Sequence, residues 1–254
     1  MEKRNTAQRR RNITEYLQQV GEASVDTLAK RFNTSEVTIR KDLGELENTG
    51  FLVRRHGGAL LIPKEHIAES QNPEISKRKL AIAKAAVDLI RDHNRVIIDS
   101  GQTTSAMLGY LEQLQGLVVM TNSLQVAQNL LNLENEPTVL MTGGTWDKRS
   151  ESFQGQVAEK VLREYDFDQL FIGADGLDLE RGTCTYNELV GLSRTMAEVA
   201  REVIVVAESN KLNRRIPNQE LAWTDINILV TDSELDEQAK QQLTAQSVRV
   251  IQTY

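Results

Sequence analysis

The chain has 254 residues, of which 40% are hydrophobic and 26% are charged, a balance typical of an ordinary soluble globular protein. No apolar run is long enough to span a bilayer, and the basic N-terminus is not followed by the apolar core of a secretory signal. The single cysteine, Cys184, excludes an intramolecular disulfide and a cysteine-based zinc site. These features predict a cytoplasmic protein.

The net charge of −6 is unevenly distributed along the chain. Residues 1–58 contain eleven Lys and Arg against eight Asp and Glu, a balance of +3, whereas the remainder contains nineteen against twenty-eight, a balance of −9. A basic head on an acidic body is expected of a nucleic-acid-binding segment joined to a larger domain. A solvated basic tail and chance unevenness would give the same charges, so charge alone does not decide the function.

Two short helices are predicted first, from apolar residues spaced three and four positions apart. These residues are Ile13, Tyr16, Leu17 and Val20 in the first helix, and Val25, Leu28, Ala29 and Phe32 in the second. Gly21 is expected to end the first helix, and Ser24 is placed to cap the second. The spacing therefore predicts two amphipathic helices in close succession.

A third helix is predicted over residues 36–47, after a turn at Asn33 and Thr34, with Ser35 as its cap. Its apolar face consists of Ile39, Leu43 and Leu46. Two amphipathic helices joined by so short a turn form a helix-turn-helix, whose second helix enters the major groove of DNA. We expect DNA contacts from the turn and from the polar side chains of the third helix, which are Thr34, Ser35, Glu36, Thr38, Arg40 and Lys41.

A hairpin is predicted next, because two β-prone runs, residues 51–53 and 59–62, flank a basic Gly-Gly turn. This hairpin completes a winged helix-turn-helix domain over residues 1–60. It would lay Arg54, Arg55 and His56 along the DNA backbone or in the minor groove. The alternative is a helical subdomain that binds no nucleic acid, and the basic hairpin counts against it.

A polar stretch bracketed by Pro63 and Pro73 predicts a linker over residues 61–75. From residue 76 to residue 254, apolar β-branched strands alternate with helices, the helices being expected at 80–90, 104–114 and 124–131. The strands are expected at residues 95–99, 117–121, 138–142, 169–173, 202–207, 226–230 and 248–251. This alternation predicts an α/β domain with a mostly parallel sheet that is covered on both faces.

Small, hydroxyl, glycine and charged residues gather where five of these strands end. In an open parallel sheet, that edge is where ligands bind. The loops at 101–104 and 121–123 lead into helices and could present backbone N–H groups to an anion, while Lys211 could supply a positive charge. A single such loop is also what any turn after a strand requires. No nucleotide fingerprint is found, so we expect neither a cofactor nor a metal.

Several of these segments resemble the motifs of the DeoR family of bacterial sugar-metabolism regulators. They are residues 37–43 (VTIRKDL), residues 54–59 (RRHGGA), the stretches DSGQTT, TNS, MTGG and GADGLD, and residues 182–188. The resemblance covers nearly the whole chain. It implies an effector-binding domain over residues 76–254, similar in fold to ribose-5-phosphate isomerase, that senses a phosphorylated sugar or polyol.

The resemblance also assigns the effector site to matching positions. They are Asp99, Gly101, Thr103, Thr104, Thr121, Asn122, Ser123, Gly143, Gly144, Asp175, Gly176, Asn187, Glu188 and Lys211. Two segments depart from the family pattern: Gln102 stands where Ser or Thr is usual, and residues 208–212 read Glu-Ser-Asn-Lys-Leu where Asp-Ser-Ser-Lys-Phe is usual. These departures leave the shape of the ligand open.

The resemblance implies a DNA-binding repressor of a carbohydrate uptake or catabolism operon, in the hexitol or amino-sugar branch of the family, which the effector releases from its operator. One winged head covers one half-site, so a dimer or tetramer is expected. The alternative is a sugar-phosphate isomerase-like enzyme with an accessory DNA-binding head, since Asp99, Asp175, Glu188 and Lys211 could transfer protons. Cys184 is expected to be a small core or pocket residue rather than a nucleophile.

Overall fold

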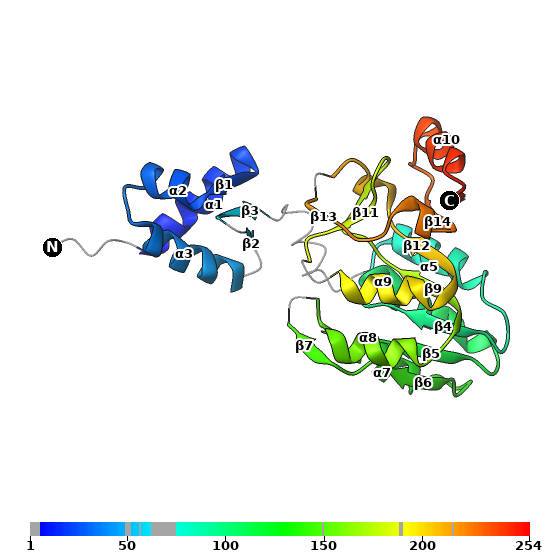
Figure 1. Cartoon of the computed structure of the whole chain (residues 1–254). Coiled ribbons are helices and arrows are strands. Elements are labelled where there is room, and N and C mark those ends of the chain that lie inside the picture. Colours follow the sequence, from blue (N-terminus) through cyan, green and yellow to red (C-terminus); the bar gives the residue numbers. More distant parts are fainter. Residues whose placement is uncertain are drawn as a thin grey trace. The chain divides into compact units, whose positions relative to one another are not determined.

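The computed structural model describes residues 6–48, 52–55, 57–61, 75–148, 150–187, 190–214 and 216–254. The chain divides into two compact units, Met1–Pro73 and Glu74–Tyr254, which are described separately below (Figure 1). Among the predicted site residues, His56 and Glu188 lie outside the described residues, as does most of the predicted linker. No described helix is both long enough and apolar enough to cross a membrane.

The N-terminal unit contains the three predicted helices and the predicted hairpin. Its elements are α1 (Thr6–Val20), β1 (Glu22–Ser24), α2 (Val25–Arg31), α3 (Glu36–Asn48), β2 (Leu52–Arg55) and β3 (Gly58–Leu61). The strands form an antiparallel sheet in the order β1-β3-β2. Strand β1 was not predicted, since three residues show no periodicity. Gly58 permits its pairing, because a Cβ at this position would lie 2.6 Å from the carbonyl oxygen of Ala23.

The core of the N-terminal unit is formed by the side chains that the helical spacing selected. Ile13, Leu17, Leu28, Ile39 and Leu43 are fully buried. The cap predicted for the second helix is present, since the Ser24 hydroxyl accepts a hydrogen bond from the Thr27 backbone N–H at 3.0 Å. Val20 was wrongly placed on the apolar face: it is the last residue of α1 and its side chain is 45% exposed, because the chain turns away at Gly21.

The C-terminal unit is built on a seven-stranded sheet, the main sheet, in which every pair of neighbouring strands is parallel. Its strands are β4 (Arg95–Ile98), β5 (Val118–Thr121), β6 (Thr138–Met141), β9 (Phe167–Ile172), β12 (Ala200–Val206), β14 (Ile228–Asp232) and β15 (Arg249–Thr253). All seven predicted strands are therefore confirmed, within two residues at most boundaries. The spatial order is β15-β14-β12-β9-β4-β5-β6.

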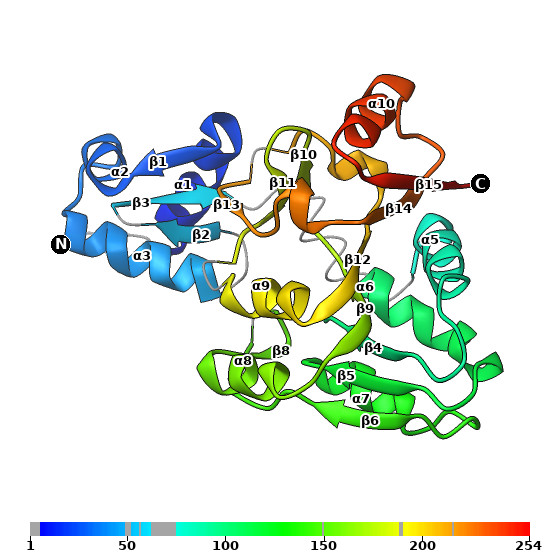
Figure 2. The ribbon, with the colours of Figure 1, turned by 45° about the vertical axis from the view of Figure 1, so that its right-hand side comes forward.

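Helices cover both faces of the main sheet, which confirms the predicted α/β class (Figure 2). One face packs against α5 (Lys77–Val87), the 3₁₀ helix η1 (Met107–Gln113) and α7 (Leu124–Leu130). The other packs against α8 (Gln156–Arg163), α9 (Gly191–Glu198) and α10 (Glu237–Ala245). The helix expected at 104–114 is in fact α6 (Gln102–Ala106) followed by η1.

Two small antiparallel sheets extend from loops of the main sheet, and neither was predicted. One consists of β7 (Thr145–Asp147) and β8 (Ser152–Gln154). The other consists of β10 (Gly176–Asp178), β11 (Gly182–Thr185) and β13 (Asn218–Gln219). Gly182 is required here, since a Cβ would overlap the carbonyl oxygen of Leu221. These strands are too short and too polar to be recognised by alternation.

Candidate ligand site and nucleic-acid interface

The loops predicted to bind the effector lie side by side in the structure. They follow β12, β9, β4, β5 and β6, which are consecutive neighbours in the main sheet. Because all of these strands are parallel, their C-terminal ends meet at one edge (Figure 2). The predicted residues that the structure describes are therefore gathered at this C-terminal edge, although they are spread over more than one hundred positions of sequence.

Asp99 and Asn122 join the loops that follow β4 and β5. Asn122 donates a hydrogen bond from Nδ2 to Asp99 Oδ1 at 2.7 Å, and its Oδ1 accepts one from the Ser100 backbone N–H at 3.0 Å. The hairpin β7-β8 joins the same group, because Phe153 N–H donates to the Asn122 carbonyl oxygen at 2.8 Å. Burial raises the pKa of Asp99 to about 6, against the opposing effect of these hydrogen bonds.

A second group of predicted residues surrounds Asp175, directly after β9. Its carboxylate accepts hydrogen bonds from the Thr185 hydroxyl at 2.8 Å and from the Tyr186 backbone N–H at 3.0 Å. Asn187 joins this group by donating its backbone N–H to the Thr185 hydroxyl. Lys211 Nζ donates to the Ala174 carbonyl oxygen at 2.7 Å, which places the ammonium group beside the same loop. The charge of Asp175 adds a small part to the rise in the pKa of Asp99.

The hydroxyl groups of the predicted loops already stabilise the loops themselves. Thr104 donates to the Gly101 carbonyl oxygen at 3.0 Å, and Thr121 accepts from the Ser123 backbone N–H at 3.1 Å. The remaining predicted positions follow strands of the main sheet or begin α6 and β10, and they are Thr103, Gly143, Gly144 and Gly176.

Glu220 is a third carboxyl group near this edge, and sequence reasoning missed it. It follows the two-residue strand β13 and is only 9% exposed. Its carboxyl oxygens accept hydrogen bonds from Ser193 at 2.7 Å and from Thr183 at 3.4 Å. Burial, with the charges of Asp99 and Asp175, raises the pKa of Glu220 to about 8. Glu220 is therefore mainly protonated at neutral pH.

Gln102 and Glu208, which both depart from the family pattern, contact Lys79, another residue that was not singled out from the sequence. Lys79 Nζ donates to Gln102 Oε1 at 2.8 Å and lies 3.8 Å from Glu208 Oε2. Glu208 also accepts a hydrogen bond from the hydroxyl of Ser76, which caps α5. Lys79 and Glu208 are each 5% exposed, so this is a buried ion pair. It ties α5 to the loops after β4 and β12.

Helix α3 presents the predicted DNA-contacting residues on the surface of the N-terminal unit. Ser35, Glu36, Arg40 and Lys41 are exposed, while Thr38 is half-buried. The Ser35 hydroxyl accepts from the Thr38 backbone N–H at 3.2 Å, so the predicted cap is present. Arg40 forms an ion pair of 2.6 Å with Glu36 one turn earlier. The Thr34 hydroxyl is buried and has no hydrogen-bond partner among the described residues.

Two arginines of the basic N-terminal segment contribute to folding as well as to charge. Arg9 and Arg10 lie 2.5 Å and 3.0 Å from the carboxylate of Asp42, which is 1% exposed on the inner side of α3. They therefore fasten α1 to α3. In the hairpin, Arg54 is exposed and its guanidinium lies near Gly44 of α3. The side chain of Arg55 lies outside the described part of the chain.

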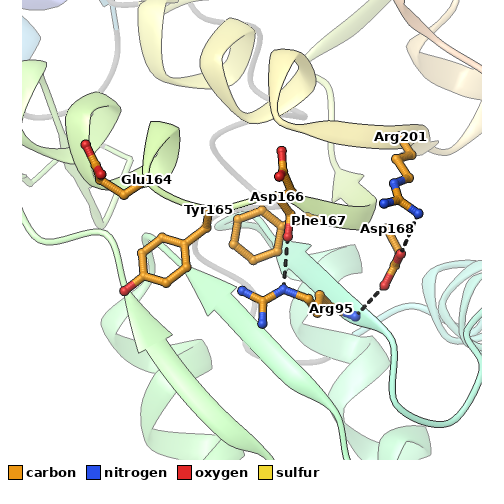
Figure 3. Close-up of a pocket in the computed structure, with 7 residues that line it drawn as sticks. All are labelled: Arg95, Glu164, Tyr165, Asp166, Phe167, Asp168 and Arg201. Carbon is orange, nitrogen blue, oxygen red and sulfur yellow. Dashed lines mark hydrogen bonds and ion pairs between the residues drawn. The ribbon is translucent and has the colours of Figure 1, made fainter.

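A hollow of about 300 Å³ lies at the opposite, N-terminal edge of the main sheet (Figure 3). Arg95 extends across it, 5.6 Å from the ring of Phe167 and bonded from Nε to the Asp166 carbonyl oxygen. Asp168 accepts from the Arg95 backbone N–H at 2.8 Å and pairs with Arg201 at 3.7 Å. None of the predicted site residues lines it. Asp168 and Arg201 already pair with each other, and the predicted residues lie elsewhere, so it is a weaker candidate than the C-terminal edge.

Cys184 is fully buried in β11, and burial raises the pKa of its thiol, which argues against an activated nucleophile. Among the described residues, no cluster of three or more His, Cys, Asp and Glu side chains is arranged to hold a metal ion. The C-terminal edge offers hydrogen bonding by carboxyl, amide and backbone groups, with the ammonium of Lys211 beside them.

Two family models match the chain. Residues 9–65 match the DeoR-like helix-turn-helix domain, and residues 74–233 match the DeoR C-terminal sensor domain. The second match alone covers more than half of the chain.

Named relatives match over almost their full length. The chain is 39% identical to a protein of Escherichia coli O157:H7 that is named as an aga operon transcriptional repressor, over 97% of this chain and 93% of that protein. It is 32% identical to the HTH-type transcriptional regulator GlpR of Haloferax volcanii, over 96% and 97% of the two chains. Among solved structures, ribose 5-phosphate isomerase A of Methanocaldococcus jannaschii aligns with 53% of each chain at a TM-score of 0.39 and 20% identity.

Proposed function

The chain belongs to the DeoR family, and on this premise we propose that it is a transcriptional repressor of a carbohydrate operon that a phosphorylated sugar or polyol releases from DNA. The observation that carries the proposal is α3 itself. Ile39, Leu43 and Leu46 of this helix are buried, whereas Glu36, Arg40 and Lys41 are exposed next to a basic hairpin. A helix so placed in a winged helix-turn-helix contacts base edges in the major groove. Such a protein would act in the cytoplasm, where the operator is accessible.

The effector is proposed to bind at the C-terminal edge of the main sheet. The carboxyl groups of Asp99 and Asp175 can accept hydrogen bonds from sugar hydroxyls, and Lys211 can balance part of the charge of a phosphate. Protonated Glu220 adds no negative charge that would repel the anion at neutral pH. The proposed site comprises the described members of the predicted set, with Glu188 as a further candidate outside the described residues.

DNA binding is tested with the full-length protein and duplexes that it selects from a randomised library. We expect Arg40→Ala and Lys41→Ala to lower the affinity. A lost base contact would cost about 1–3 kcal/mol, and a lost phosphate contact would lower the salt slope by roughly 1. Arg201→Ala, at an exposed position of the C-terminal unit, is the matched control. Unchanged affinity in both α3 variants at every salt concentration would contradict the proposal.

Effector binding is tested by thermal shift against pentose, hexose, hexitol and amino-sugar phosphates, each compared with its non-phosphorylated form. Asp99→Asn and Lys211→Ala should bind DNA normally but respond weakly to the effector, whereas the exposed control Lys160→Ala should behave as the wild type. A coupling of about 1–3 kcal/mol would weaken DNA binding 5- to 150-fold. Equal effects of the sugar and its phosphate would count against the proposed anion site.

The same panel tests whether the protein is a binding protein or an enzyme. We propose that it binds sugar phosphates without converting them. Tight binding without isomerisation in a coupled assay is the expected result, and turnover would favour a sugar-phosphate isomerase.

Assembly is the remaining part of the proposal. One winged head covers a single half-site, so operator recognition calls for two heads related by symmetry. We expect sedimentation to show a dimer or tetramer at micromolar concentration, and a monomer alone would contradict this.

A further inference from the structure

One apolar side chain interrupts the polar surface of α3. Val37, the second residue of the helix, is 73% exposed, whereas Ile39 and Leu43 on the same helix are fully buried. Among the large apolar side chains described in the N-terminal unit, the next most exposed is Val20, at 45%. The exposure of Val37 therefore distinguishes it from every other apolar residue of the helix.

The stability of the free protein does not explain this residue. A β-branched side chain forms helix less readily than alanine, and an exposed one gains almost nothing from burial. Val37 also makes no contribution to the cap of α3, which Ser35 and Thr38 provide through their hydroxyl groups and a backbone N–H. A contact with another molecule would give a valine at this position a role.

The neighbours of Val37 indicate what that molecule presents. The hydroxyls of Ser35 and Thr38 lie 2.8 Å apart and bond to each other, and Arg40 pairs with Glu36. Val37 lies on the same side of the helix as Arg40 and Lys41, three and four residues later. Two methyl groups are therefore exposed at the N-terminal turn of α3, beside two cationic side chains.

In the major groove, the thymine C5-methyl is the apolar group that distinguishes one base from the others. We propose that Val37 packs against the C5-methyl of a thymine in each half-site and so determines specificity at that base pair. This inference rests on the proposed function of α3 as the helix that enters the major groove. The polar residues predicted from the sequence to contact DNA are thereby joined by one apolar residue that contacts a base.

The test compares thymine with deoxyuridine, which lacks only the methyl group. The full-length protein selects its preferred duplexes from a randomised library, and each thymine is then replaced in turn by deoxyuridine. We expect a loss of about four-fold in affinity at one thymine of each half-site, as for the removal of one buried methyl-sized group. In Val37→Ala, both bases at this position should bind equally well, whereas Val37→Ile should retain the preference.

The matched control is Val157→Ala, since Val157 is likewise the second residue of a helix and is 62% exposed, but it lies in the C-terminal unit. This control should keep the thymine preference of the wild type. The inference is overturned if Val37→Ala discriminates thymine from deoxyuridine as strongly as the wild type at every position, or if the wild type discriminates at none. Those results leave DNA binding by α3 intact. Failure to select or bind any duplex would instead refute the proposed function, and this inference with it.

Discussion

Glu220→Gln should change how the stability of the C-terminal unit depends on pH. Burial raises the pKa of Glu220 from 4.5 to about 8. Between these values the unfolded chain is ionised while the folded protein keeps the proton, so the free energy of unfolding falls as pH rises. The contribution is fully present below pH 4.5 and is lost by about pH 8. The limiting slope is 1.36 kcal/mol per pH unit and it diminishes near pH 8, so the loss between pH 6 and pH 8 is about 2 kcal/mol.

Glutamine resembles the protonated acid at every pH. It can still accept the hydrogen bond from Ser193, which is 2.7 Å long in the wild type. The variant should therefore lose this part of the pH dependence and gain stability over the wild type, by about 2 kcal/mol, between pH 6 and pH 8. Because burial raises the pKa of Asp99 to only about 6, its own contribution is largely lost before this range.

Urea unfolding followed by tryptophan fluorescence is a suitable assay, because both tryptophans, Trp146 and Trp223, lie in the C-terminal unit. Titrations at pH 6, 7, 8 and 9 give the free energy of unfolding at each pH. The exposed Glu112→Gln is the control and should follow the wild-type curve. A difference between Glu220→Gln and the wild type that stays constant from pH 6 to pH 8 would refute the reasoning.

Two further predictions concern buried ion pairs. Asp42→Ala leaves Arg9 and Arg10 without their carboxylate. Because these arginines are 14% and 27% exposed and can be hydrated, we expect the free energy of unfolding of the N-terminal unit, measured by thermal unfolding, to fall by about 1–3 kcal/mol. A fall of less than about 0.5 kcal/mol would contradict this prediction. Lys79→Met leaves Glu208 buried without a counter-charge and should lower the free energy of unfolding in urea by about 3–5 kcal/mol. The double variant Lys79→Met with Glu208→Gln should restore much of this loss. Additive losses from the two substitutions would show that the two groups are not coupled.

The sequence alone determined the elements with strong local patterns. The strands of the main sheet are continuous apolar runs, since both of their faces are buried, and all seven were predicted on that basis. The helices of the N-terminal unit follow from the spacing of residues such as Leu28 and Leu43, and their starts follow from Ser24 and Ser35, whose hydroxyls bond to a backbone N–H three residues later. These features are predictable because they depend on residues that are close together in the chain.

Only the tertiary structure decided which distant residues meet. The strand order places the loops after β12, β9, β4, β5 and β6 side by side, and no local pattern encodes that order. Glu220 follows a two-residue strand without periodicity, and its raised pKa depends on the burial that the folded chain imposes. Lys79 was not singled out from the sequence, yet it is buried against Gln102 and Glu208. Hydrophobic periodicity indicates on which face of a helix or strand a residue lies. Desolvation and charge pairing depend instead on the surrounding elements, which only long-range packing brings together.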